Sequence, residues 1–318
     1  MKTIASFHLG ASSLSSALIT TDCQISAATF KAIPPPGWRM HTYDQILDDL
    51  TSSFRDLTKN AACDAIVVTT PAPIDKSVGT VRIAPGIPGI QHRQLVGDLV
   101  ERFREPVGKV IPVYIENDAN AAGLRSREFG LGRDVDDFIH VRVSTGIGAA
   151  LFLNGSLYVG PRHLAGEIGH VPLQAWGKQC GCGNQGCAET LIGGAALLEI
   201  LKVQSPSDAP TGCHFLDITQ GRTAPSDAVR AELATMGTYL GIVLAGAVNL
   251  IGPEVVLLSG PMFDPNGILL REAQQEAKKR FCIGMECDLV LDEFAGADGH
   301  ALSSLAVFLH ETGNGHVN

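Results

Sequence analysis

The same order of predicted elements occurs twice along this chain, and that repetition constrains the fold more than any other feature of the sequence. A meander of β-strands followed by helix, strand and helix begins at residue 1 and begins again near residue 137. Short apolar runs bounded by Gly, Asn, Asp and Ser predict the strands, and apolar residues at helical spacing predict the helices. We therefore expect two mixed α/β halves with a cleft between them, and ligands bound where strands end at that cleft.

The chain of 318 residues is long enough for two domains, since a domain usually spans about 100–200 residues. We expect an N-terminal α/β domain over residues 1–120, rejoined by a C-terminal helix within 300–318, and a second α/β domain over 121–299. The continuous apolar run 64–70 is typical of a strand buried on both faces. Asn154-Gly155, between two apolar alternations, predicts a tight hairpin in the second domain.

Apolar spacing and capping residues predict the helices. Thr42 is the expected N-cap of a helix over 42–59, and Asn117-Asp118 begins an Ala-rich helix that ends near Phe129. The remaining expected helices cover 94–104, 189–202, 226–251, 266–280 and 300–311. The expected strands cover 4–9, 14–20, 23–31, 64–70, 112–116, 138–143, 254–259 and 288–293. The polar stretch 203–226 is interpreted as a loop or an insertion.

Charge and hydropathy argue against several classes of protein. The formal charge is −9 and no clustered Lys/Arg surface is visible, which argues against a nucleic-acid partner. The most apolar stretch, 233–252, is interrupted by polar and small residues, so it predicts a buried helix rather than a membrane span. The N-terminus lacks the pattern of a secretory signal peptide. Eight cysteines, three of them within 180–187, fit a reducing compartment, and we expect a cytoplasmic protein.

The most specific chemical signal is a histidine followed by three closely spaced cysteines: His170, Cys180, Cys182 and Cys187. Three thiolates and one imidazole form a closed tetrahedral set of the kind that holds structural zinc. Glycines beside the cysteines give the backbone room to wrap a small ion. With four protein ligands, the ion has no position for a catalytic water. The alternative is that the cysteines are free buried thiols, or that Cys180 and Cys187 form a disulfide.

Two carboxylates flank this cluster. Glu167 precedes His170 by three residues, and Glu189 follows Cys187 by two. Held by a bound metal, both acids and the second imidazole N–H would form a rigid set of one donor and two acceptors, which suits the vicinal hydroxyls of a sugar. The spacing fits equally well an exposed loop acid at 167 and an acid at a helix N-terminus at 189, where the helix dipole favours it.

These residues, with the turn before them, resemble the signature of the ROK family (sugar kinases, open reading frames and repressors). The resemblance rests on Ser-Thr-Gly-Ile-Gly at 144–148, Gly-Glu-Ile-Gly-His at 166–170, Cys-Gly-Cys-Gly-Asn-Gln-Gly-Cys-Ala-Glu at 180–189 and Glu-Asn-Asp-Ala-Asn-Ala-Ala at 116–122. It implies the actin-like ATPase (ribonuclease-H-like) fold of two α/β domains, with sugar and ATP meeting in the interdomain cleft. The order of strands and helices is similar to the family's over nearly the whole chain.

The resemblance also implies roles for individual residues. Asp118 would be the general base that takes the proton of the attacking sugar hydroxyl. The residues implied to bind sugar hydroxyls are Asn117, Glu167, His170 and Glu189. The residues implied to lie near Mg–ATP are Gly10, Ser12, Thr145, Gly146 and Gly260. Taken without the family, the Gly-rich turn is an ordinary turn between strands, and Asp118 is equally an N-cap of its helix.

Four residues depart from the kinase pattern of the family. His8 stands where the family has an aspartate facing Mg²⁺ and phosphate, and an imidazole does not replace a hard anionic oxygen ligand. Ala11 adds a β-carbon where the backbone approaches a phosphate. Gly86 replaces an asparagine that contacts sugar, and Pro261, after Gly260, lacks a backbone donor beside the adenosine.

Two functions remain open, and the first is placed slightly ahead. One is ATP-dependent phosphorylation of a hexose or N-acylhexosamine, favoured because Asp118 and the sugar-binding set occur together. The other is a sugar-binding regulator, or a sugar-converting enzyme, that has lost the use of ATP; it is favoured by the four departures. A repressor of the family needs a helix-turn-helix before the first strand, and the sequence begins at that strand, so we expect this third class to be excluded.

Two expectations concern association and the remaining thiols. We expect a homodimer, and helix 226–251 either contributes to its surface or, as the more ordinary interpretation, lies buried between domains. Cys282 and Cys287 are expected to be two buried thiols.

Overall fold

The computed structural model describes residues 1–33, 37–59, 62–107, 110–221, 225–292 and 296–313. The chain packs into two units, each with its own sheet and hydrophobic core. Unit 1 comprises 1–133, 159–165 and 294–318, and unit 2 comprises 134–158 and 166–293. The helices and strands of both units confirm the expected α/β class. The expected domain ranges remain a prediction.

Unit 1 contains a five-stranded sheet in the order β3-β2-β1-β4-β7. Its strands are β1 (Thr3–Gly10), β2 (Ser13–Thr20), β3 (Ile25–Ala32), β4 (Ala65–Thr70) and β7 (Val113–Asn117). The first three form the expected antiparallel meander, whereas β4 and β7 run parallel to β1. The register pairs His8 with Thr69 and Thr69 with Glu116, so the carboxyl ends of three parallel strands bring polar residues to one edge of the sheet.

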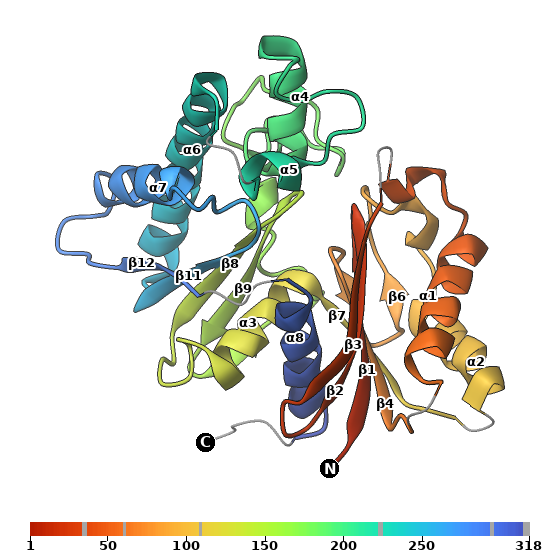
Figure 1. The fold of residues 1–318 in the computed structure, drawn as a ribbon. Coiled ribbons are helices and arrows are strands. Elements are labelled where there is room, and N and C mark those ends of the chain that lie inside the picture. The colour runs from red at the N-terminus through yellow and green to blue at the C-terminus, as the bar shows by residue number, and fades with distance from the viewer. Residues whose placement is uncertain (34–36, 60–61, 108–109, 222–224, 293–295, 314–318) are drawn as a thin grey trace. The chain divides into compact units, whose positions relative to one another are not determined.

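Helices cover both faces of this sheet (Figure 1). On one face lie α1 (Tyr43–Leu57) and α2 (Leu95–Val107); on the other lies α8 (Gly296–Glu311), with α3 (Asp118–Phe129) packed beside it. The Thr42 side chain accepts a hydrogen bond from the Gln45 amide, which confirms the expected N-cap of α1. α8 begins at Gly296 instead of at residue 300. The minor elements are β5 (Ile74–Asp75), β6 (Thr80–Val81) and the 3-10 helices η1 (Gly37–Met40) and η2 (Pro88–Ile90).

Unit 2 contains a second five-stranded sheet, in the order β10-β9-β8-β11-β12. Its strands are β8 (Phe138–Val143), β9 (Ile147–Leu153), β10 (Ser156–Tyr158), β11 (Val255–Ser259) and β12 (Asp288–Leu291). β8 to β10 form an antiparallel meander, and β11 and β12 run parallel to β8, as β4 and β7 do to β1. Asn154 and Gly155 join β9 to β10 with φ values of 51° and 72°, which confirms the predicted hairpin turn.

The helices of unit 2 differ from expectation in two places. The expected helix 189–202 is split: Glu189 lies in the 3-10 helix η4 (Ala188–Thr190), and α4 (Gly194–Gln204) begins only after Gly193, whose φ is 104°. The expected loop 203–226 contains a short helix, α5 (Phe215–Thr219), which the His214 side chain caps. Cys287 is buried as expected, but Cys282 is exposed, because it lies in the turn after α7 (Ile268–Lys278).

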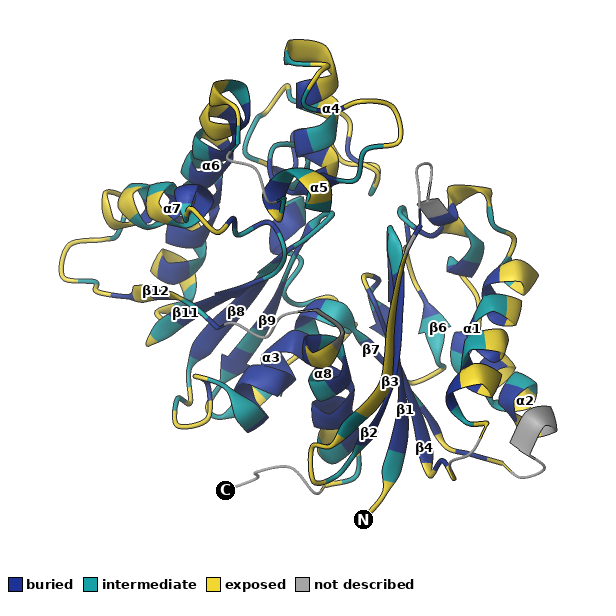
Figure 2. Ribbon diagram, in the orientation of Figure 1, coloured by how far each residue is buried: buried dark blue, intermediate teal, exposed yellow. Residues whose placement is uncertain are grey.

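Among the described residues, one helix, α6 (Asp227–Ile251), is long and apolar enough to cross a membrane. Its residues contribute to the hydrophobic core of unit 2 (Figure 2). A β-carbon on Gly237 would lie 2.8 Å from the carbonyl oxygen of Leu269, and one on Gly241 would lie 2.7 Å from that of Ala273. The two glycines therefore let α6 approach the backbone of α7 closely, as a buried helix does.

Candidate functional site

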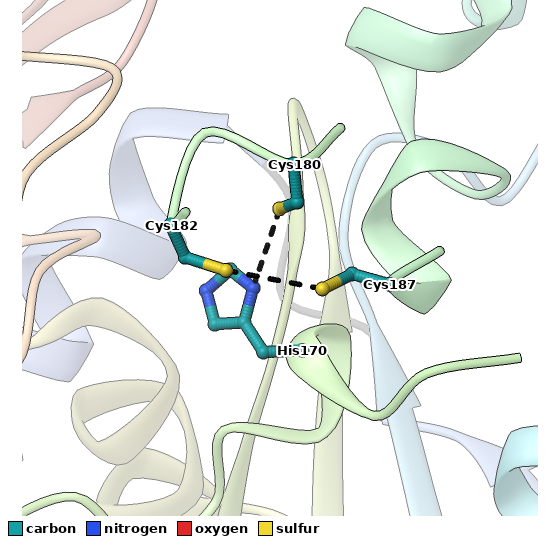
Figure 3. Close-up of side chains that lie close together, drawn as sticks. All are labelled: His170, Cys180, Cys182 and Cys187. Atoms are coloured by element: carbon teal, nitrogen blue, oxygen red, sulfur yellow. Dashed lines mark hydrogen bonds between the residues drawn. The ribbon is translucent and has the colours of Figure 1, made fainter. Parts of the chain in front are cut away.

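Four side chains of unit 2 converge as the sequence predicts: His170, Cys180, Cys182 and Cys187 (Figure 3). One ligand atom of each lies within 4.8 Å of the others. His170 Nδ1 is 3.7 Å from the Cys180 sulfur, and the Cys182 and Cys187 sulfurs are 3.8 Å apart. A tetrahedral zinc ion with Zn–S bonds of about 2.3 Å separates its sulfur ligands by about 3.8 Å. The donor set therefore fits zinc. The cysteines are free thiols, so the alternative disulfide is wrong.

Burial changes the acidity of these thiols. It raises the pKa of Cys187 to about 12, with hydrogen bonding from Cys180 as a further cause, and it also raises the pKa of Cys180. The apolar surroundings thus favour the neutral thiols. A metal that binds here must displace their protons, so we expect metal affinity to rise with pH.

The loop that carries the cysteines is shaped by glycines and backbone hydrogen bonds. Gly183 and Gly186 have φ values of 94° and 70°, a region that other residues rarely adopt. A β-carbon on Gly186 would also lie 1.7 Å from the Gln174 carbonyl oxygen. The Leu173 amide donates a hydrogen bond to the Gly186 carbonyl, and the Cys180 amide donates one to the Asn184 carbonyl. The thiols are therefore held on an ordered loop.

The two ring nitrogens of His170 have different neighbours. Nδ1 faces Cys180, whereas Nε2 lies 3.7 Å from Oε2 of Glu167. The side chains are partly exposed, 29% for His170 and 36% for Glu167. When a metal engages Nδ1, the proton is on Nε2. His170 and Glu167 then present a donor and an acceptor side by side, the combination that a sugar hydroxyl binds.

Glu189 contacts the Gly-rich turn between β8 and β9. Its Oε2 accepts a hydrogen bond from the Ile147 amide at 3.3 Å. A β-carbon on Gly146 would lie 2.0 Å from the same oxygen, so any other residue there would have to displace the Glu189 carboxylate. Two residues for which the family resemblance implies different ligands, sugar for Glu189 and nucleotide for Gly146, are thus in direct contact. The contact gives a packing reason for glycine at 146.

The same turn caps α4, and a second glycine packs beside it. The carbonyls of Ser144 and Thr145 accept hydrogen bonds from the amides of Gly194 and Ala195 at the start of α4. Gly260 has a φ of 115°, and a β-carbon there would lie 2.1 Å from the Val143 carbonyl oxygen. Gly260 is therefore required for packing against β8. The Pro261 carbonyl after it accepts hydrogen bonds from the side chains of Thr219 and Gln220, from α5 and the residue that ends it.

In unit 1, Asn117 and Asp118 lie where β7 ends and α3 begins. Asn117, not Asp118, is the N-cap of α3: its Oδ1 accepts from the Ala119 amide at 2.9 Å and the Asn120 amide at 3.2 Å. This occupies the side-chain oxygen of Asn117 and leaves its amide nitrogen as the group suited to a ligand oxygen. Asp118 is the first residue of the helix and is half-buried.

In unit 1, the end of β1 makes contacts with β4 and α8 that the sequence does not predict. The buried ring of His8 makes a 3.0 Å hydrogen bond to Oγ1 of Thr69. The His300 ring from α8 stacks on it, with centroids 3.8 Å apart and planes inclined by 9°. A β-carbon on Gly10 would lie 2.9 Å from Nε2 of His8. Gly10 therefore packs against the imidazole.

Two further departures from the kinase pattern fit each other. A β-carbon on Gly86 would lie 2.8 Å from the β-carbon of Ala11. The methyl group of Ala11 therefore takes up the space that a side chain at residue 86 would need. The Ser12 carbonyl, in the turn between β1 and β2, accepts a hydrogen bond from the Ile33 amide at 2.8 Å. Side chains and backbone of this chain thus pack closely around the first loop.

Two α/β units of matching topology give this chain the actin-like ATPase fold that solved sugar kinases share. The chain belongs to the ROK family, whose model matches residues 4–301. The resemblance noted in the sequence is thereby confirmed.

Solved structures of both kinases and regulators share this fold. The ROK family glucokinase from Streptomyces griseus, solved with glucose and AMPPNP, has a TM-score of 0.79 at 22% identity, over 95% of this chain and 98% of the kinase. The ROK hexokinase from Thermus thermophilus has a TM-score of 0.71 at 25% identity, over 98% and 99%. A ROK family transcriptional regulator, a homologue of the Escherichia coli MLC protein, has a TM-score of 0.75 at 23% identity, over 96% and 78%.

Similar curated proteins include several regulators. The DNA-binding transcriptional dual regulator NagC of Escherichia coli is 29% identical over 231 residues, 71% of this chain and 54% of the regulator. The xylose repressor of Bacillus subtilis is 33% identical over 174 residues, 54% of this chain and 43% of the repressor. The chain spans about half the length of these relatives. Because these relatives are a DNA-binding regulator and a repressor, they do not support two of our expectations from the sequence. These are that the protein has no nucleic-acid partner and that it is not a repressor.

Proposed function

We propose that this protein is a sugar-binding member of the ROK family that has lost the use of Mg–ATP. The observation that carries the proposal is the stack of His8 on His300 at the end of β1, where the family's kinases have an aspartate. The proposed sugar-binding residues are Asn117, Asp118, Glu167, His170 and Glu189. Structural zinc on the Cys₃His cluster is part of the same proposal.

The packing around the first loop supports the loss of nucleotide binding. An imidazole that is buried and stacked offers no anionic oxygen to Mg²⁺. The Ala11 methyl group lies against Gly86, in a loop whose backbone would have to approach a phosphate closely. In unit 2, the Ile147 amide donates to Glu189, so this N–H of the Gly-rich turn is engaged within the chain.

The retained polar groups support a carbohydrate ligand. Glu167 and His170 present an acceptor and a donor, and the Asn117 amide nitrogen adds a donor at the start of α3. We propose a hexose or an N-acylhexosamine. A relative described as N-acetylglucosamine repressor supports this class of ligand, and one described as xylose repressor supports a sugar ligand more broadly. The protein would then act as the sugar sensor of a regulator, or convert a sugar without ATP.

One observation favours a second candidate, the ATP-dependent sugar kinase: Asp118 and its capping neighbour Asn117 are both at the start of α3. In that reaction the Asp118 carboxylate accepts the proton of the attacking hydroxyl as the oxygen forms its bond to the γ-phosphorus and ADP leaves. Mg–ATP would supply the phosphoryl group. Asn117 and His170 would orient the sugar by donating hydrogen bonds.

A melting-shift screen distinguishes the two candidates. The full chain is heated with millimolar glucose, N-acetylglucosamine or xylose, with and without Mg–ATP, and ADP release is measured in parallel. We expect at least one sugar to raise Tm and Mg–ATP to leave it unchanged, because only a ligand that binds the folded state stabilises it. Sugar-dependent ADP release that is lost in Asp118→Asn but retained in the exposed control Asp134→Asn would establish the kinase instead.

A further inference from the structure

A buried carboxylate, Glu116, lies directly before the two residues proposed to bind sugar. Its side chain is 3% exposed. Oε1 accepts hydrogen bonds from the Asn117 amide at 2.7 Å and from the Asn120 side-chain amide at 3.1 Å. Asn120 in turn donates its backbone amide to Oδ1 of Asn117. One oxygen of Glu116 therefore orients both asparagines of the first turn of α3, on either side of Asp118.

The other oxygen of Glu116 forms an ion pair with Lys76. The same ammonium group lies 2.5 Å from Oε1 of Glu311 at the end of α8. Burial by itself lowers the pKa of the Lys76 amine, but the charges and hydrogen bonds of Glu116 and Glu311 raise it above the ordinary value. The amine is therefore protonated over the physiological pH range and neutralises the buried carboxylate.

The hairpin that carries Lys76 is itself fixed. Asp75, the last residue of β5, accepts hydrogen bonds from the amide and hydroxyl of Ser77 and pairs with Arg82. The Arg82 amide donates to the Pro73 carbonyl at 3.0 Å. These contacts hold the turn from which the Lys76 side chain extends toward Glu116. The ion pairs with Glu116 and Glu311 restrict the rotamers of this long side chain.

We propose that Lys76 is a positioning residue: its ammonium group fixes the Glu116 carboxylate, which in turn orients Asn117, Asn120 and therefore Asp118 for the sugar. The inference rests on the proposed role of Asn117 and Asp118 and adds a residue to that site. It follows from the cost of an unpaired buried charge. Without Lys76, Glu116 has to rotate toward water or take up a proton, and either change disturbs the hydrogen bonds that Oε1 accepts.

The test compares Lys76→Met with Lys76→Arg, which restores the charge, and with Lys59→Met in the turn after α1. Lys59 pairs with Asp56, and both side chains are 69% exposed, so its loss removes an ion pair without touching Glu116 or the hairpin that carries Lys76. Hydrogen exchange of the Asn117, Ala119 and Asn120 amides is measured in each full-length variant. We expect exchange in Lys76→Met to be at least about 10-fold faster at these amides than in the wild type, while residues 124–129 of α3 are unchanged. Lys76→Arg should lie near the wild type, and Lys59→Met should leave all of these amides unchanged.

Sugar affinity provides the second measurement, with glucose, N-acetylglucosamine and xylose as probes in calorimetry at a temperature where every variant is folded. We expect Lys76→Met to weaken binding about 10-fold or more, because small displacements of a binding group reduce affinity and rate strongly. A lower Tm with unchanged exchange at the three amides would overturn the inference and make Lys76 a purely structural residue. If the wild type binds none of the three sugars, the proposed function fails, and the exchange experiment still decides the role of Lys76.

Discussion

The Glu189 carboxylate lies so close to the α-carbon of Gly146 that a β-carbon on this glycine would be 2.0 Å from Oε2. Glu189 is two residues beyond Cys187, and Gly146 lies in the turn that caps α4. The Cys₃His loop and the Gly-rich turn of unit 2 are therefore joined by one carboxylate. We therefore expect a substitution in the Gly-rich turn to alter the structure of the Cys₃His loop, and a substitution in that loop to alter the turn.

Gly146→Ala tests this contact. The new methyl group has to displace the Glu189 carboxylate, which breaks its hydrogen bond to the Ile147 amide. We expect the free energy of unfolding to fall by about 1–3 kcal/mol and the Ile147 amide to exchange faster. Urea unfolding and hydrogen exchange measure the two effects.

The matched control for that variant is Gly246→Ala in α6. No atom beyond its immediate neighbours and its own helix's backbone lies within 4 Å of the added β-carbon. Alanine at an exposed helix interior position should stabilise the protein by about 0.5–1 kcal/mol. Equal effects of the two substitutions would show that Glu189 does not occupy the space beside Gly146.

The parts of the fold that the sequence predicts are those set by local spacing. The four metal-ligand candidates fall within residues 170–187, the Thr42 cap lies next to its helix, and Asn154-Gly155 is a two-residue turn. Each is specified by residues that are near neighbours in the chain, so its geometry follows from spacing alone.

The contacts that the sequence does not predict join distant segments. His300 meets His8 because α8 packs on β1, and Lys76 meets Glu116 because the β5–β6 hairpin lies beside the end of β7. Neither pair leaves a periodic signal in the chain. The resemblance to the ROK family implies a sugar-binding role for Glu189, whereas its contact with Gly146 depends on how the loop folds back on the turn.

Metal analysis and chelation test the Cys₃His cluster. We expect one zinc ion per chain, and removal by a chelator should lower Tm, since a structural metal contributes its binding free energy to folding. Cys182→Ser should lose the metal and show the same lower Tm without chelator. The exposed thiol of Cys282 serves as the control, and Cys282→Ser should retain zinc. A protein that holds no zinc at neutral pH, yet keeps its Tm in Cys182→Ser, would contradict a metal site.

Burial raises the pKa of the Glu232 carboxyl in α6 above its ordinary value of 4.5. The folded state therefore binds this proton more tightly than the unfolded chain, and the stability contributed by the protonated group is lost as pH rises from about 4.5 through the folded-state pKa. Glu232→Gln should be more stable than the wild type at pH 7, and the difference should shrink toward pH 4. The exposed Glu286→Gln should show no such pH-dependent gain. Thermal unfolding across pH 4–8 measures both.

The stack of His8 and His300 leads to a gain-of-function prediction. His8→Asp places a carboxylate at the end of β1, and Ala11→Gly removes the methyl group that lies against Gly86. If these two residues block the nucleotide, the double variant should gain a Tm increase with Mg–ATP that the wild type lacks. Sugar-dependent ADP release in the double variant would show that Asp118 is still a competent base. Unchanged Tm with Mg–ATP in a double variant that still binds sugar would show that the block lies elsewhere, and Pro261 beside Gly260 would be the next residue to change.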